Sequence, residues 1–233
     1  MSVAYETFMM ARPATITVVD GFVRSRGTSG AFPPPLGTLR FVLAARFVAN
    51  VATALDPPVV LKAITRGSGV FVVPNEGTIG GGPALAIPPG RYRLVISSDV
   101  YQTDTRDVDW PTGAPNMPVV VLAPGPAYPF PDVTMVSNAL TLVRGSILVT
   151  GTAKPVAGAV VSFTAPANTW PFATCRSDAN GGWALAIPIG AGAAPFDATL
   201  HVALPDGTSF DAAPVTIQPG AENSVPAFRI ASA

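Results

Sequence analysis

Short apolar segments with an alternating pattern, bounded by glycine and proline, occur along much of this chain. In one of them, Tyr92, Leu94 and Ile96 would share one face of an extended strand, because successive side chains point to opposite sides. Residues 183–187 and 198–204 alternate in the same way. The 22 glycines and 26 prolines mark the turns between such segments. The sequence therefore predicts an all-β protein rich in turns.

The segment 39–54 is the best candidate for a helix, because it is rich in alanine, leucine and arginine. Phe41, Phe47 and Val48 nevertheless favour extended structure, since aromatic and β-branched side chains are enriched in strands. We predict strands in this segment as well.

Two short segments indicate an internal repeat. Residues 81–90 and 181–190 are identical at eight of ten positions, at an offset of 100 residues. Such self-similarity is typical of repeated structural units, so we predict two related domains. Four prolines between residues 123 and 132 predict an extended, stiff spacer between them.

The predicted organisation has four parts. They are an N-terminal arm at residues 1–13, a first β-sandwich domain at 14–122, a Pro-rich linker at 123–135 and a second β-sandwich domain at 136–233. We expect the arm to dock on a neighbouring subunit, by adding a strand to an exposed sheet edge.

The segment 177–182 predicts a hairpin turn. Asp178 can accept hydrogen bonds from nearby backbone N–H groups, and both Asn180 and Gly181 tolerate positive φ. Trp183 then begins the next strand and is expected to lie in the core.

Three motifs carry a family resemblance. Residues 155–160 read Pro-Val-Ala-Gly-Ala-Val, residues 175–183 read Cys-Arg-Ser-Asp-Ala-Asn-Gly-Gly-Trp, and residues 88–96 read Pro-Pro-Gly-Arg-Tyr-Arg-Leu-Val-Ile. They resemble the carboxypeptidase regulatory-like family, whose members have a transthyretin-like (prealbumin-like) β-sandwich. The resemblance implies two tandem seven-stranded Greek-key β-sandwiches joined by the Pro-rich spacer. It does not imply one function, because such modules are structural or adhesive accessories in many unrelated proteins.

The charge balance argues against two kinds of partner. Lys and Arg number 14, as do Asp and Glu, so the net charge is zero, whereas nucleic-acid-binding proteins usually have a basic surface. The sequence has no run of about 18 apolar residues, so no membrane insertion is expected. The first residues lack the basic start and long apolar stretch of a signal peptide, so we predict synthesis in the cytoplasm without one.

Catalytic and metal-binding residues are scarce. Cys175 is the only cysteine and His201 the only histidine, which excludes an intrachain disulfide and any site that needs two imidazoles. The alternation places His201 on the outer face of a sheet, and Cys175 is expected to be a buried strand residue despite the neighbouring arginine. We predict that the chain has no catalytic residue and no cofactor, and that it is not an enzyme.

The carboxylates of Asp104, Asp107 and Asp109 are close in sequence, and clustered carboxylates can bind calcium. Their spacing does not match an EF-hand, and Arg106 stands among them. We therefore interpret them as a solvated loop or strand face and predict no metal site.

Aromatic residues in predicted loops are the candidates for partner or ligand contacts. Trp110 and Trp170 each precede a proline, and Phe172 follows in the same segment as Trp170. Loop tryptophans can anchor a partner, but they also cap the ends of sandwiches. Both readings stay open.

An apolar, weakly charged chain has a surface suited to coverage by neighbours. We therefore hypothesise a non-enzymatic structural subunit of a larger protein assembly, a phage-type particle such as a tail, baseplate, contractile injection system or capsid decoration. Its partners would be other protein subunits, including further copies of itself, and it would be located in a virion or similar particle. The alternative is a module that binds carbohydrate or a cell surface through the loop aromatics.

Overall fold

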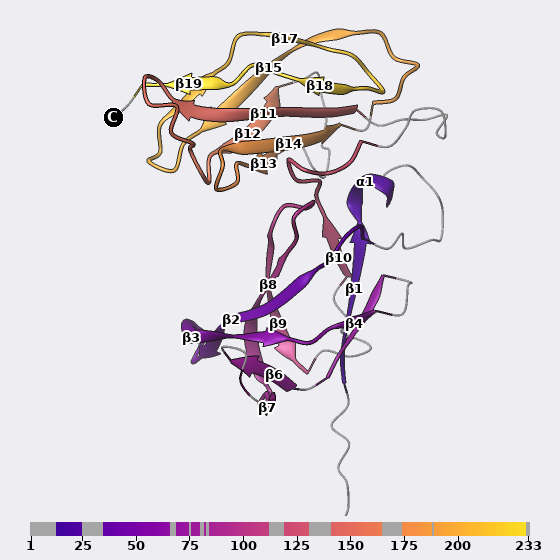
Figure 1. The fold of residues 1–233 in the computed structure, drawn as a ribbon, viewed down its shortest axis with the longest axis vertical. Coiled ribbons are helices and arrows are strands. Elements are labelled where there is room, and N and C mark those ends of the chain that lie inside the picture. The colour runs from indigo at the N-terminus through magenta and orange to yellow at the C-terminus, as the bar shows by residue number, and fades with distance from the viewer. Residues whose placement is uncertain are drawn as a thin grey trace, which may run out of the picture. The chain divides into compact units, whose positions relative to one another are not determined.

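The structure is a computed structural model (Figure 1). It describes residues 13–24, 35–65, 69–74, 76–79, 82, 84–111, 119–130, 141–164, 174–187 and 189–231. The described part is almost entirely strand and turn, with one short helix, α1 (Gly21–Arg24). The predicted all-β class is therefore confirmed.

Contacts between residues divide the chain into two compact units, and neither unit is continuous in sequence. Unit 1 comprises Met1–Val18, Leu39–Ile96 and Asp104–Val120, and unit 2 comprises Val19–Thr38, Ser97–Thr103 and Val121–Ala233. Two segments that the sequence analysis assigned to the first domain, Val19–Thr38 and Ser97–Thr103, thus belong to unit 2.

In the described residues, ten strands precede the predicted second domain. They are β1 (Ala14–Asp20), β2 (Arg40–Val48), β3 (Val51–Leu61), β4 (Ile64–Thr65), β5 (Val70–Val73), β6 (Glu76–Ile79), β7 (Ala84–Ala86), β8 (Gly90–Ser97), β9 (Asp104–Trp110) and β10 (Val119–Leu122). They form a six-stranded sheet in the order β7-β6-β3-β2-β8-β9 and a four-stranded sheet in the order β10-β1-β5-β4.

The alternating pattern explains the core of unit 1. Tyr92, Leu94 and Ile96 of β8 are all buried, as their spacing predicts. Phe41 of β2 and Phe71 of β5 come from different sheets, and their ring centroids lie 5.1 Å apart. The two sheets of this unit therefore share one apolar core.

The strands of the second half are β11 (Thr141–Val149), β12 (Val160–Thr164), β13 (Thr174–Arg176), β14 (Gly182–Ile187), β15 (Phe196–Ala203), β16 (Ser209–Asp211), β17 (Val215–Ile217), β18 (Glu222–Ser224) and β19 (Phe228–Ile230). One sheet has the order β14-β11-β18, with β19 also on β11, and the other has the order β13-β12-β15-β16, with β17 also on β15. Trp183 and Ile147 of the first sheet share a buried cluster with Val161 and Leu200 of the second, which is consistent with a β-sandwich.

The sheet orders do not follow the repeat offset of 100 residues. In one half β1 lies between β10 and β5, and in the other β11 lies between β18 and β14. If β11 corresponds to β1, then β14 corresponds to β5, since each is a neighbour of that strand. The sequence repeat instead aligns β14 with β7. The described strands also exceed the seven predicted for each half.

The turn before β14 forms as its sequence predicts. The backbone N–H groups of Asn180 and Gly182 both donate to Oδ1 of Asp178, each over 2.8 Å. Gly181 takes a φ of +73°, while Asn180 is not among the residues with positive φ. Trp183 is fully buried, as expected.

Gly145 provides a test of packing in unit 2. It lies opposite Trp183 in the β11–β14 pair, and a Cβ at this position would lie 2.5 Å from the indole ring. Gly145→Ala should therefore lower the free energy of unfolding by about 1–3 kcal/mol, the usual cost of overpacking a core. The measurement is urea unfolding followed by tryptophan fluorescence. Gly192→Ala is the control, because a Cβ there meets nothing within 4 Å; equal stability of the two variants would contradict this packing.

Candidate functional site

The structure places only one of the three predicted contact aromatics. Trp110 is the last residue of β9 rather than part of a loop, and it is only 3% exposed. Its indole is therefore part of the packing of unit 1 and offers no platform at the surface. Trp170 and Phe172 lie outside the described residues.

The three clustered carboxylates are divided between the two faces of β9. Asp104 forms an ion pair with Arg106 on its own face, at 3.0 Å. Asp107 lies on the opposite face and pairs with Arg93 of β8, also at 3.0 Å. Within the described residues, no group of three or more His, Cys, Asp or Glu side chains could share a metal ion.

His201 and Cys175 occupy structural positions. His201 lies on β15 with its Nδ1 2.8 Å from Oδ1 of Asp211, its partner on the neighbouring strand β16. Cys175 is 3% exposed, and burial raises the pKa of its thiol far above the ordinary value. A neutral buried thiol is a poor nucleophile, because the thiolate is the reactive form.

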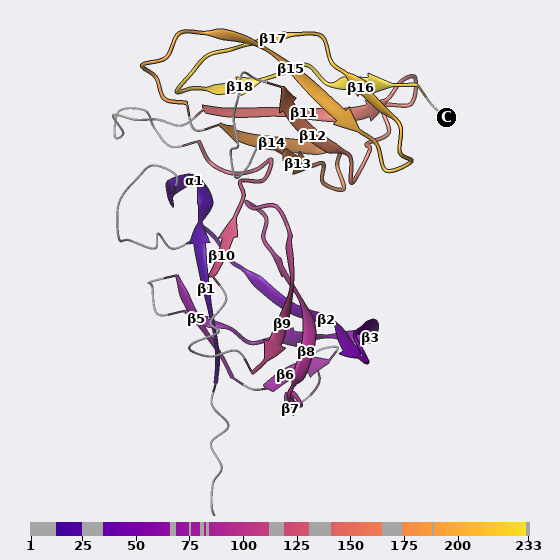
Figure 2. The same ribbon diagram turned by 180° about the vertical axis from the view of Figure 1, so that it is seen from behind.

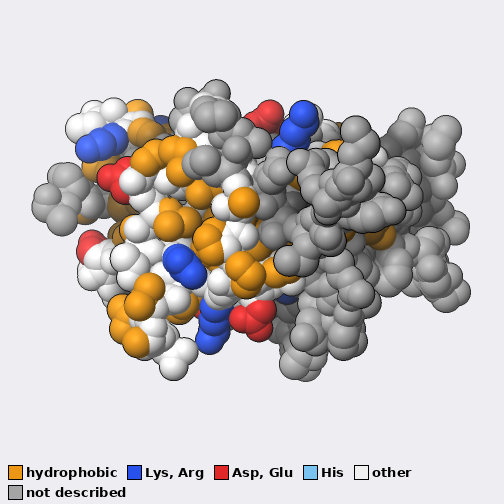
Figure 3. Space-filling view, turned by 90° about the horizontal axis from the view of Figure 1, so that it is seen from below, with side chains coloured by type: hydrophobic (Ala, Val, Ile, Leu, Met, Phe, Trp, Pro, Cys, Tyr) orange, Lys and Arg blue, Asp and Glu red, His pale blue; other side chains and the backbone are white. Residues whose placement is uncertain are grey.

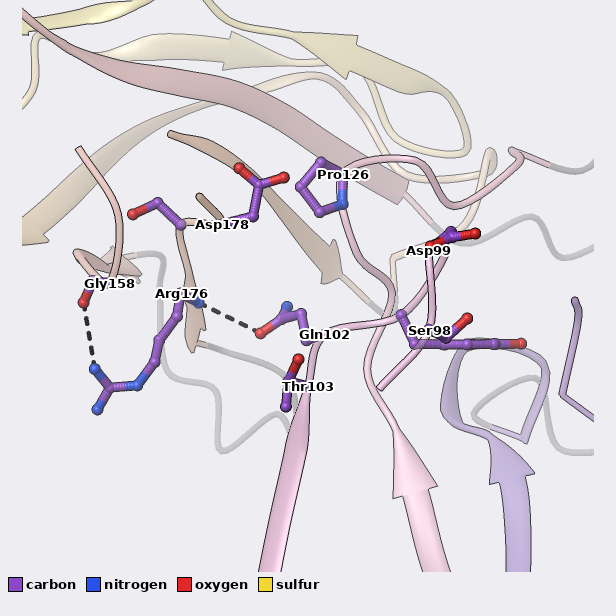
Figure 4. A pocket seen from close by; sticks show the side chains of 10 residues that line it. Ser98, Asp99, Gln102, Thr103, Pro126, Gly158, Arg176 and Asp178 are labelled. Atoms are coloured by element: carbon purple, nitrogen blue, oxygen red, sulfur yellow. Dashed lines mark hydrogen bonds between the residues drawn. The ribbon is translucent and has the colours of Figure 1, made fainter. Parts of the chain in front are cut away.

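Unit 2 contains a polar hollow of about 310 Å³ (Figure 4). Gln102 lies at its centre, donating to the carbonyl oxygens of Pro124 and Ala184 and accepting from the N–H of Arg176. The Arg176 guanidinium donates to the carbonyl of Gly158. These hydrogen bonds join separate segments of unit 2, so Gln102 acts here as a structural residue. No pattern around Gln102 in the sequence indicated this role.

A second polar cluster in unit 2 surrounds the buried carboxylate of Asp20. The hydroxyls of Tyr101 and Tyr128 donate to its Oδ2 over 2.6 and 2.7 Å, and the N–H of Phe22 donates to its Oδ1. The hydroxyl of Tyr101 also accepts from the N–H of Leu36. Burial, and then the bond to Asp20, raise the pKa of Tyr101.

Among the described residues, the most exposed large apolar side chains belong to the hairpin of β2 and β3 in unit 1. Val48 is 61% exposed and Val51 is 66% exposed, and they face each other across a two-residue turn. Ala49 and Asn50 form this turn with φ of 48° and 64°, the left-handed values of a type I′ hairpin. The turn that joins β2 and β3 lies at the lateral edge of unit 1 (Figures 1 and 2).

The base of this hairpin is held by cation–π contacts. The guanidinium carbons of Arg91 and Arg93 lie 4.9 and 5.4 Å from the ring centroid of Phe47, and that of Arg46 lies 5.8 Å from the ring of Tyr92. The charged groups are therefore gathered beside β8, and the tip carries none. A space-filling view also shows hydrophobic side chains over much of the described surface on one face, with isolated charges between them (Figure 3). The hairpin tip, Val48–Leu55, is the candidate functional site.

Known proteins offer only distant likenesses. No family model and no curated protein matches this chain. The Bacillus anthracis TIE protein has 11% identity and a TM-score of 0.29, over 94% of this chain and 34% of that one. A streptococcal ancillary pilin has 14% identity and a TM-score of 0.28, over 96% of this chain and 64% of that one. At these TM-scores the likeness assigns neither a function nor a partner to this chain.

A shaft pilin of Lactobacillus rhamnosus GG is similar at 13% identity and a TM-score of 0.28, over 93% of this chain and 97% of that one. The predicted localisation is corrected by these structures. They are named as pilins and not as virion proteins. The prediction of a virion component made in the cytoplasm without a signal peptide is therefore wrong and is not kept. The described residues contain no helix that is both long and apolar enough to cross a membrane.

The raised pKa of Tyr101 predicts a loss of stability at alkaline pH. The unfolded chain releases this proton near the ordinary tyrosine pKa of about 10, while the native state retains it. The stabilisation is therefore complete below about pH 10 and declines as the pH rises above that value. Urea unfolding between about pH 9 and pH 11.5 should show a smaller decline for Tyr101→Phe than for the native sequence. Identical slopes would contradict the buried bond to Asp20.

Proposed function

We propose that this chain is a non-enzymatic structural subunit of a larger protein assembly. The observation that carries this proposal is the hairpin tip, where Val48 and Val51 are both more than half exposed and no charged residue lies between Arg46 and Asp56. Exposed apolar surface of this kind is stabilised when another subunit covers it.

The other exposed large apolar side chains support the same proposal. Ile64 is 52% exposed, Leu36 is 42% exposed and Val119 is 37% exposed. Charged residues make up 12% of the sequence, so few groups keep such a surface favourable in water. A subunit surrounded by neighbours tolerates this composition better than a freely diffusing enzyme.

The described side chains with catalytic potential favour a structural role. His201 is paired with Asp211, and Cys175 is buried with a raised thiol pKa. The polar hollow is crossed by hydrogen bonds of Gln102 that join segments of the chain. We propose on these grounds that the subunit has no enzymatic activity.

We also propose that both halves are Greek-key, transthyretin-like modules of the carboxypeptidase regulatory-like kind. The turn capped by Asp178 supports this for the second half, because it adopts the hairpin that the motif at residues 175–183 implies. The carbohydrate-binding alternative has no comparable support. Trp110 is buried, and Trp170 and Phe172 lie outside the described residues.

The proposal is tested by changing the hairpin tip. In extracts of the source cells, the native chain should sediment with particles much larger than its 23.8 kDa. The double variant Val48→Asp, Val51→Asp should move to slow fractions, because burying two valines contributes about 1.5–3 kcal/mol each. Circular dichroism should show that the variant keeps its fold.

Ala194→Asp is the control, since it adds a charge at an exposed apolar position that the proposal assigns to no contact. It should leave the sedimentation unchanged. A native chain that sediments as a monomer in these extracts would overturn the proposed function.

A further inference from the structure

None of the described strands pairs with one edge of β3 next to the hairpin turn. Next to the turn, residues Val51–Ala54 of β3 pair with β2 along one edge of the strand. In the described part of the chain, β6 pairs with β3 only at Val59–Leu61. Val51 and Thr53 direct their backbone groups to β2, so within Val51–Leu55 the N–H and C=O groups of Ala52 and Ala54 point to the open edge.

Between the turn and the irregular part of β3 that begins after Ala54, this edge lacks the features that keep strand edges apart. Proteins usually protect an exposed edge with charged side chains, prolines or bulges. The edge strand β9 follows that rule, because Asp104, Arg106 and Asp107 lie along it. Val51–Leu55 reads Val-Ala-Thr-Ala-Leu, with no charge and no proline. Such a segment is suited to pairing with another strand.

We propose that this edge pairs with the same edge of a second copy of the chain, antiparallel and centred on Thr53. This inference rests on the proposed function and names the partner of the hairpin tip. In this register Val51 lies opposite Leu55 of the second copy, Ala52 opposite Ala54, and Thr53 opposite Thr53. The two β3 strands then join the two sheets into one.

The segment is complementary to itself in this register. Large apolar side chains meet at both ends, small alanines meet between them, and a threonine pair lies at the centre, which is a favourable cross-strand pair. Two residues that face each other in this register have sequence numbers that differ by an even number. In each copy their backbone N–H and C=O groups therefore point to the same edge of β3. The outward groups of one copy therefore meet the outward groups of the other.

Neighbouring registers fit less well. Centring on Ala54 would bring Asp56 and Pro57 into the pair, in the part of β3 where the pairing with β2 is irregular. Centring on Ala52 would place Asn50, a turn residue, within the pair. Centring on Thr53 uses only residues between the turn and the prolines.

The space along the edge also fits a hairpin. Five paired residues extend over about 16 Å, and the strand pair with β6 begins only at Val59. The turn of the second copy then lies beside Asp56 and the following prolines. The pairing covers Val51, which is 66% exposed in the single chain.

The central position allows a charge test. Thr53→Lys and Thr53→Glu each place like charges opposite one another, so each variant alone should dimerise up to about fivefold more weakly than the native chain. An equal mixture of the two variants should associate at least as strongly as the native chain, because Lys then faces Glu. Sedimentation equilibrium at low salt measures both effects, since salt would screen the charges. Thr105→Lys, on the edge strand β9, is the control and should leave association unchanged.

A disulfide tests the register itself. Opposite residues of antiparallel strands have Cα atoms about 4.5–5.5 Å apart, within the range that a disulfide spans. Thr53→Cys should therefore form a covalent dimer on mild oxidation. The native chain should not, because Cys175 is its only cysteine and is buried. Thr105→Cys is the matched control and should remain largely monomeric.

The outcomes separate this inference from the proposed function. A native chain that stays monomeric at all concentrations overturns the self-pairing, as does a Lys and Glu mixture that associates no better than either variant alone. If the self-pairing fails in this way while Val48→Asp, Val51→Asp still releases the chain from its native particles, the hairpin binds a different subunit. The proposed function then stands, and the second copy is not the partner.

Discussion

The carboxylate of Asp20 is the point at which unit 2 is held together outside its main core. Its two oxygens accept hydrogen bonds from Tyr101, Tyr128 and the backbone of Phe22. These groups come from separate segments of the chain, which a sandwich core alone would not join. A buried carboxylate destabilises the fold unless it is hydrogen-bonded. The hydrogen bonds to Asp20 therefore fix the positions of the three segments that donate them.

The Pro-rich segment is one of the segments that these hydrogen bonds hold in unit 2. Tyr128 belongs to the predicted linker, yet it is buried, and the Arg144 guanidinium donates to the carbonyl oxygens of Pro126 and Tyr128. Gly125 also donates its N–H to the carbonyl of Val100. The described residues 123–130 of the predicted linker are therefore packed as part of unit 2.

The sequence predicted strand faces better than strand neighbours. Tyr92, Leu94 and Ile96 are buried because period-two alternation is a local property of the chain. The repeat at residues 81–90 and 181–190 was a poorer guide, because it encodes a strand and its following turn wherever that strand lies in a sheet. Which strands pair depends on contacts that a local motif does not specify.

The candidate site was harder to predict for the same reason. Trp110 was predicted in a loop because a proline follows it, whereas the structure places it at the end of β9, on the face opposite Asp107 and Asp109. The hairpin at Ala49 and Asn50 lacks the usual Asn-Gly turn signal, so its tight turn was not foreseen. The exposure of Val48 and Val51 depends on where the neighbouring strands end, which the sequence does not reveal.

The symmetry of the β3 edge limits what it can build. A contact in which Thr53 meets its own equivalent is isologous, so it is satisfied once two chains have met and it cannot recruit a third. An assembly of more than two chains therefore requires a second, chemically different surface on each subunit. Pairing at the hairpin tip would then make a dimer the building block, and the assembly would grow by the addition of dimers.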